Sequence, residues 1–204
     1  VDDVEISPIN TDITTEVGII SLGEMEPQNT DTITFNDIMP EEVIDAAQIA
    51  ILGGIPIEIE ETNIEPIVKE FTFSSISEAV ISTSSIHLTI TNDMFITLGD
   101  TIDVELRNIE TDAVLGEVSF IGEIGTGESN TETLNMNGVI LPGIINIHIS
   151  GKTLGTNDDS QLIQSTDLDT GFFISITIEE MYELSDAILD NNMEEIKQEL
   201  VVKT

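Results

Sequence analysis

The sequence predicts an all-β protein, an antiparallel β-sandwich with one or two short helices. Apolar and polar residues alternate strictly in its clearest segments, as in Ile86-His87-Leu88-Thr89-Ile90. Hydrophobic residues make up 40% of the chain but aromatic residues only 4%, so the core is aliphatic and rich in isoleucine. Because β-branched side chains suit a pleated sheet better than a helix, this composition favours strands.

The alternating pattern predicts a series of short strands along the chain. Turn-forming pairs such as Asn-Asp, Gly-Asp and Asn-Gly separate them. Short strands at intervals of about ten residues are typical of a sandwich or a barrel. The predicted strands cover residues 55–59, 68–73, 86–90, 102–106, 114–120, 131–136, 145–149 and 173–178.

Two segments depart from this pattern and predict helices. Residues 40–52 begin with a proline and two glutamates and are followed by glycine, which are typical start and stop signals of a helix. Residues 182–200 have apolar residues at approximately helical spacing, although Asn191-Asn192 interrupts them and a strand is the alternative.

A weak internal repeat predicts the domain organisation. Residues 21–32 and 38–40 resemble residues 119–133 and 140–142, and residues 53–61 resemble residues 171–180 in the same order. We therefore expect a shorter β unit over residues 1–66, a fuller sandwich unit over residues 67–180 and a C-terminal tail, helix or strand, over residues 181–204. The alternative is a chance similarity among strands rich in Ile, Thr and Glu.

Four segments also carry a resemblance to a known family. They are IHLTITN (86–92), IDVEL (102–106), SNTETL (129–134) and GIINIHISG (143–151). Their strand rhythm resembles the LEA-14 and water-stress (WHy) domains, and similar repeats of secreted bacterial surface proteins. The resemblance implies an immunoglobulin-like sandwich without catalytic residues. It covers about a third of the chain, and the usual Asn-Pro pair is Asn92-Asp93 here.

The charge excludes several classes of partner. The formal net charge is −35, from 40 acidic residues against five Lys and Arg that are scattered singly. A nucleic-acid backbone or an anionic membrane surface requires clustered basic residues, so we expect neither as a partner. The self-repulsion of such a chain is relieved by salt or calcium, so a halophilic setting, a calcium-rich exterior and a charge that serves solubility alone all fit.

Localisation is predicted from composition, because the chain has no cysteine to indicate a redox compartment. No apolar run approaches the roughly 20 residues of a membrane span, so we expect no membrane insertion. The sequence starts at Val1 without methionine, which suggests a processed signal peptide or an excised fragment. Strands rich in Thr, Ser, Asn and Asp with almost no Lys lead us to expect an extracellular or cell-surface protein.

Motifs for catalysis are weak. Gly151-Lys152-Thr153 is like the end of a phosphate-binding loop, but the first glycine of that motif is Asn146 here, inside a predicted strand. His87 and His148, on the polar faces of two strands, would need a carboxylate to bind zinc or iron, and solvent-facing histidines are the alternative. No nucleophile motif is present, and 40 acidic residues form many carboxylate pairs by chance.

Calcium is the cofactor that the composition favours, although none is required. Two turn-rich segments bring carboxylate and amide oxygens together in sequence, and calcium prefers such oxygen ligands. The alternative is that these residues only form turns. The candidate metal ligands are Asn157, Asp158, Asp159, Asp167 and Asp169.

We therefore expect a non-catalytic structural module, either a repeat spacer or a subunit of a filament or surface assembly. Its expected partners are copies of itself or adjacent modules, joined at exposed edges of its sheets. The stretch 4–13 has strand-like alternation and is a candidate for strand addition to a neighbour. The alternative function is a calcium-assisted adhesive module that binds a cell-surface or glycan ligand.

Overall fold

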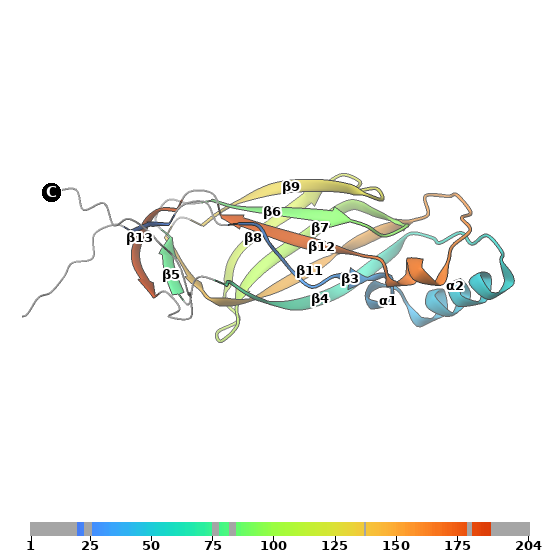
Figure 1. The fold of residues 1–204 in the computed structure, drawn as a ribbon, viewed down its shortest axis with the longest axis horizontal. Coiled ribbons are helices and arrows are strands. Elements are labelled where there is room, and N and C mark those ends of the chain that lie inside the picture. The colour runs from blue at the N-terminus through green and yellow to red at the C-terminus, as the bar shows by residue number, and fades with distance from the viewer. Residues whose placement is uncertain are drawn as a thin grey trace, which may run out of the picture.

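The computed structural model describes residues 20–22, 26–74, 78–81, 85–136, 138–178 and 181–188. They form an antiparallel sandwich whose strands run along the long axis of the molecule, with short helices at one end (Figure 1). The predicted all-β sandwich with short helices is confirmed. The stretch 4–13 lies outside the described residues.

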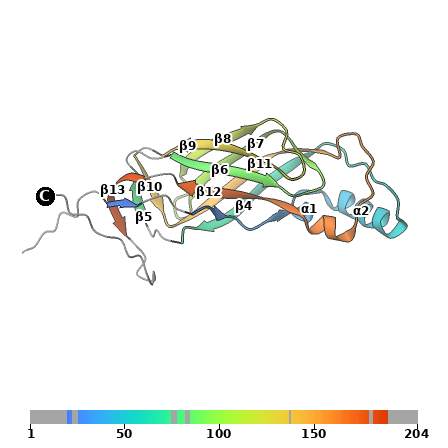
Figure 2. The same cartoon turned by 45° about the horizontal axis from the view of Figure 1, so that its top comes forward.

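Two sheets make up the sandwich (Figure 2). The first has the order β4 (Thr62–Thr72), β11 (Ile144–Gly155), β7 (Thr97–Asn108), β8 (Val114–Ile121). The second has the order β2 (Gln28–Asn29), β12 (Gly171–Ile178), β6 (Ser85–Asn92), β9 (Glu128–Asn135), and β3 (Ile33–Thr34) also pairs with β12. A small sheet at the other end joins β1 (Ile20–Leu22), β13 (Met181–Ile188), β5 (Glu78–Ile81) and β10 (Val139–Pro142).

The core follows directly from the alternation in the sequence. In the alternating stretches of β6 and β11 every second residue is a fully buried aliphatic: Ile86, Leu88 and Ile90, and Ile145, Ile147 and Ile149. The residues between them point outward and are polar, because successive side chains of a strand face opposite sides of the sheet. Burial of the aliphatic rows of both sheets stabilises the sandwich through the hydrophobic effect.

Three short helices lie at one end of the sandwich: α1 (Phe35–Ile38), α2 (Glu41–Gly53) and η1 (Ser165–Asp169). Glu41 and Glu42 occupy the first turn of α2, where carboxylates interact favourably with the helix dipole. Gly54 ends the helix in the left-handed conformation, with φ 58°, and its N–H donates to the Ile51 carbonyl. The helix predicted over residues 40–52 is confirmed.

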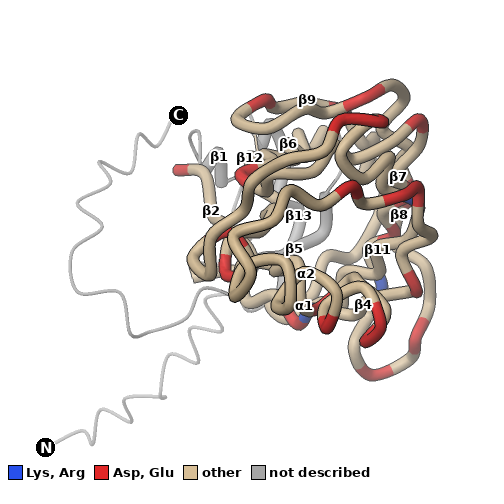
Figure 3. Tube along the Cα trace, turned by 90° about the vertical axis from the view of Figure 1, so that its right-hand side faces the viewer, with Lys and Arg blue, Asp and Glu red and all other residues tan. Residues whose placement is uncertain are grey.

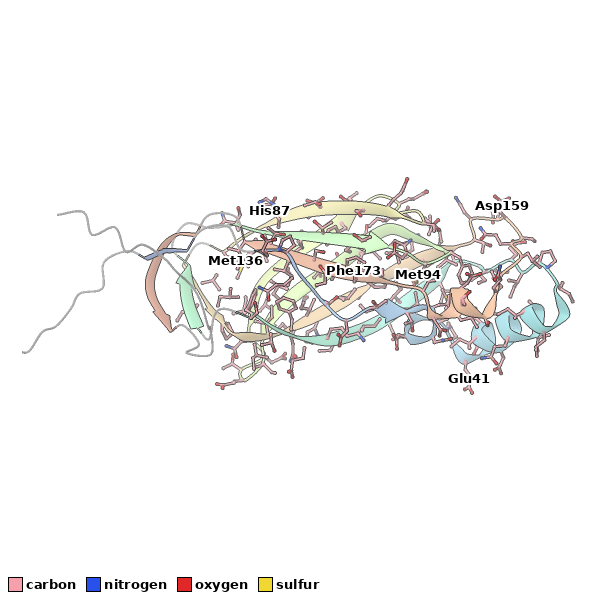
Figure 4. All side chains as sticks on the ribbon, viewed as in Figure 1. Glu41, His87, Met94, Met136, Asp159 and Phe173 are labelled. Atoms are coloured by element: carbon pink, nitrogen blue, oxygen red, sulfur yellow. The ribbon has the colours of Figure 1, made fainter. Side chains whose placement is uncertain are left out.

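One buried side chain fixes the loops at the helical end of the sandwich. Asn92, at the end of β6, donates its amide N–H groups to the carbonyls of Ile96 and Ile124, both at 2.9 Å. Its Oδ1 accepts the N–H of Met94, which is buried there (Figure 4). Asn92 thus connects the β6–β7 loop to the β8–β9 loop.

The structure departs from the predictions at three places. Residues 55–59 form no strand but a single bridge between Ile57 and Gln161, since the chain leaves α2 here and Pro56 has no N–H to donate. Over the described part of the predicted 182–200 segment the structure has the strand alternative, β13, in place of a helix, and residues 189–204 of the tail lie outside the described residues.

The third departure concerns the two predicted units. The boundary between residues 66 and 67 falls inside β4. Strands from the first unit pair with strands from the second in both sheets, β4 with β11 and β2 and β3 with β12. In the described residues, units 1–66 and 67–180 therefore do not form separate sandwiches, because each needs the strands of the other to complete its sheets.

Candidate functional site

The predicted calcium ligands lie in two turns. Asn157 and Asp158 follow β11 with φ of 55° and 64°, and Asp159 is exposed beside them (Figure 4). Asp167 and Asp169 belong to η1, where the Asp167 carboxylate accepts the Gln164 N–H at 2.7 Å. In the part of the chain that the structure describes, no three His, Cys, Asp or Glu side chains gather closely enough to hold a metal ion. The described geometry gives these residues turn-forming roles.

The two histidines are not brought together. His87 lies on β6 and His148 on β11, and each points out of its own sheet, on opposite sides of the sandwich. Thr133 on β9 is 2.9 Å from Nδ1 of His87. A shared zinc or iron site at these histidines is therefore excluded by their positions on the two outer faces.

The Gly151-Lys152-Thr153 segment forms part of β11 rather than a phosphate-binding loop. The Thr153 hydroxyl donates to the Thr97 carbonyl on β7 at 2.8 Å. Lys152 Nζ forms ion pairs with Asp100 at 2.7 Å and with Glu61 at 3.1 Å. These contacts hold β11 against its neighbours and leave the segment no free groups arranged for a phosphate.

Ion pairs shift the pKa of three groups. Hydrogen bonding and charge attraction to Lys152 lower the pKa of Asp100, and hydrogen bonds to Asp100 and Glu61 raise the pKa of Lys152. Arg107 has its pKa raised mainly by the hydrogen bond to Glu105, whose carboxylate lies 2.6 Å from Nη2. All three groups are on the surface, so these shifts belong to exposed ion pairs, between β11 and β7 for Lys152 and Asp100 and within β7 for Arg107 and Glu105, rather than to a buried reactive site.

On one side of the sandwich, the edges of the two sheets lie against each other. The edge strands β8 and β9 lie beside each other there, and Asn130 donates to the Ile121 carbonyl at 3.4 Å. Leu134 packs against Gly116, where an added Cβ would lie 2.7 Å from Leu134 Cδ2. Side chains therefore cover the gap between these two edges.

The opposite side carries the longest edge strand. β4 pairs with β11 alone among the described strands, so its outer edge extends over 11 residues. Val68 on this strand is 50% exposed. Pro66 and Lys69 also lie on β4, and both residue types restrict the addition of a further strand. Because the chain has only five Lys and Arg, the sequence alone did not show that one of them falls on the longest edge.

The outer faces of the two sheets differ in charge. Nine outward residues of β11, β7 and β8 form the charged face, and four of them carry a formal charge: Asp103, Glu105, Arg107 and Glu117. The others are Ser150, His148, Asn146, Ser119 and Val114. Acidic residues recur along the whole described chain, while Lys and Arg are few (Figure 3).

The corresponding nine residues of the second sheet form what we call the hydroxyl face. They stand in three rows across β12, β6 and β9: Phe173, Thr91 and Ser129; Ser175, Thr89 and Thr131; Thr177, His87 and Thr133. None of the nine is Asp, Glu, Lys or Arg. Each strand alone shows polar outward residues in the sequence, but only the pairing register reveals the uncharged surface.

Comparison with known proteins adds no relative: no known protein family matches the sequence, and no curated protein matches it. The resemblance to LEA-14 and water-stress domains stays a prediction from strand rhythm. Among the described residues, no helix has the length and apolar character needed to cross a membrane.

Proposed function

We propose that this chain is a non-catalytic structural module of an extracellular or cell-surface assembly. It acts as a repeat spacer or as a filament subunit, and it associates with copies of itself or with adjacent modules through the edges of its sheets. The observation that carries the proposal is the outer edge of β4, which has no strand partner among the described residues. Pro66 and Lys69 limit strand addition in the middle of this edge and leave the residues on either side for a contact.

The shape of the sandwich supports a spacer role. The strands of both sheets run along the long axis, with the helices at one end and the small sheet at the other (Figure 1). Twelve residues at about 3.3 Å each give β7 and β11 a length of roughly 40 Å. Continuous strands of this length connect the two ends through hydrogen-bonded sheet, which suits a module that keeps its neighbours at a fixed distance.

Charge and composition support the proposed extracellular or cell-surface location. A net charge of −35 is best tolerated where salt or divalent cations are plentiful, and a chain without cysteine keeps its fold whatever the redox state outside the cell. The described ionisable groups with shifted pKa are all in surface ion pairs, and the pair of Lys152 with Asp100 joins β11 to β7. Such groups serve the stability of a scaffold.

The test compares two matched variants, Val68→Glu and Val114→Glu. Both valines lie on edge strands and are 50% exposed, so each substitution adds one negative charge to a similar environment. Light scattering of the purified chain at near-physiological salt measures its mass over a range of concentrations. We expect the intact chain and Val114→Glu to associate, and Val68→Glu to associate less, because its charge lies on the outer edge of β4.

Two outcomes would contradict the proposal. An intact chain that stays monomeric from micromolar to millimolar concentration has no self-association to explain. Equal association of both variants would show that the β4 edge is not part of the contact. Thermal unfolding followed by circular dichroism checks that Val68→Glu still folds, so that a loss of association is not a loss of the sandwich.

A further inference from the structure

The hydroxyl face differs from the remaining surface because it lacks formal charge. Its nine residues include no Asp, Glu, Lys or Arg, whereas four of the nine matching residues on the charged face are charged. The chain has 40 acidic residues in 204. Three adjacent strands without an outward carboxylate therefore make a broad neutral area on a strongly acidic molecule.

The polar groups of this face bond to one another across the strands. Thr89 and Thr131 hydroxyls are 2.8 Å apart, and Thr91 and Ser129 hydroxyls are 2.9 Å apart. At the β2 edge, Ser175 donates to Asn29 Oδ1 at 2.6 Å. Since these hydroxyls already have protein partners, removing water from the face leaves few of them unsatisfied, and the cost of covering the face is low.

The face also contains an aromatic side chain. Phe173 is half-buried in the row with Thr91 and Ser129, near the middle of the sandwich in Figure 4. Large aromatic residues contribute most to protein interfaces when neighbouring side chains keep water away from them. The methyl groups of the surrounding threonines supply apolar contact of that kind.

We propose that the hydroxyl face binds the hydroxyl face of a second copy of this chain. Two molecules with a charge of −35 each repel one another, and a face-to-face pair through these strands brings no outward carboxylate of either sheet into the centre of the contact. The face is regular in register and seven of its nine side chains are Ser or Thr, so a second identical face can lie against it, as two sheets do inside a sandwich.

The size of the hydroxyl face sets the expected affinity of the face-to-face pair. Three strands about 4.8 Å apart and five residues of each strand at about 3.3 Å give a contact of roughly 15 by 16 Å, an area of about 240 Å², less than the ~800 Å² per partner of a standard stable complex. The pair is therefore weak and reversible in dilute solution. It becomes effective when many copies are held close together, as in an ordered assembly.

This contact is separate from the proposed edge contact of β4, which belongs to the other sheet. One molecule with both contacts has two surfaces for neighbours in different directions. Repetition of two such contacts builds an extended array rather than a closed dimer. Either contact is able to exist without the other, so their tests are independent.

The experiment compares Ser175→Glu with Ser150→Glu. Both serines are half-buried and point outward from inner strands, the first on the hydroxyl face and the second on the charged face, and both substitutions add one negative charge. Sedimentation equilibrium at 0.1 and 0.5 M sodium chloride gives the association constant of each protein. We expect Ser175→Glu to weaken association at least about tenfold and Ser150→Glu to change it less than about twofold.

A second pair of variants is a control for misfolding, because Ser175→Glu also removes the hydroxyl that donates a hydrogen bond to Asn29. Thr131→Glu and Ser119→Glu are both exposed on edge strands, and both residues hydrogen-bond to the adjacent strand. We expect only Thr131→Glu to weaken association. Association of the intact chain should rise with salt as repulsion is screened. Equal effects within each pair would overturn the proposal even if the Val68→Glu result supports the edge contact. A monomeric intact chain at 0.5 M salt would contradict both proposed contacts.

Discussion

Replacing Asn92 with alanine removes three hydrogen bonds from a fully buried position. The carbonyl of Ile96 and the N–H of Met94 lose their side-chain partner. The carbonyl of Ile124 keeps the bond from the Leu98 N–H at 3.1 Å, so its loss is partial. Each buried polar group left unsatisfied costs about 1–3 kcal/mol, so we expect a loss of about 3–5 kcal/mol in the free energy of unfolding.

Urea unfolding followed by circular dichroism measures this loss. Such a loss is a large share of the roughly 5–15 kcal/mol that stabilises an ordinary domain. Asn63→Ala is the control, because Asn63 is exposed on β4, and we expect it to stay within about 0.5 kcal/mol of the unmodified chain. A cost below about 1 kcal/mol for Asn92→Ala would refute the role given to this amide.

Asn92→Asp sharpens the test through its pH dependence. The carboxylate retains an acceptor for Met94 but faces the carbonyls of Ile96 and Ile124 in a buried site, so its pKa in the folded state rises above the unfolded value. The folded state then holds more protons, and stability relative to the unmodified chain falls as pH rises above about 4. Unfolding curves between pH 5 and 8 should show this growing deficit, whereas a constant deficit would contradict it.

Three further predictions concern the backbone, an ion pair and the charge. Gly155→Ala should lower stability by about 2–4 kcal/mol in urea unfolding, since φ is +64° and the new Cβ would overlap the Ile59 carbonyl; a neutral effect would contradict this close approach. In Lys152→Met, the pKa of Asp100 measured by NMR should rise towards its ordinary value, because the ion pair lowers that pKa. The stabilisation by the ion pair is present above pH ~4 and is lost as pH falls through the pKa of the folded state. An unchanged titration of Asp100 would exclude the ion pair. Sodium chloride should raise the melting temperature by screening 40 carboxylates. Calcium should raise the melting temperature more than sodium does at equal ionic strength only if calcium is bound by Asn157, Asp158, Asp159, Asp167 and Asp169. Equal melting temperatures in chelator and in millimolar calcium would exclude a calcium site.

The part of the fold that follows from local pattern was predictable. The alternation at residues 86–90 and 145–149 marks β6 and β11, because burial on one face of a strand imposes a period of two. Helix α2 was predictable from its acidic first turn and its terminal glycines. These features depend only on neighbouring residues.

Features that depend on long-range pairing were not predictable. Residues 55–59 alternate like a strand, yet only Ile57 meets a partner, since no neighbouring strand continues beside them. The repeat suggested two units, but β2 and β3 find their partner more than 130 residues away, on β12. The hydroxyl face required the register of three strands, which a single sequence does not reveal.

Electron microscopy of the concentrated intact chain at near-physiological salt tests the central proposal, a structural module that associates with its own copies, most directly. We expect ordered assemblies with a regular repeat, reduced in Val68→Glu and in Ser175→Glu and retained in Val114→Glu and Ser150→Glu. Dispersed single molecules of the intact chain at every concentration, with or without calcium, would contradict it.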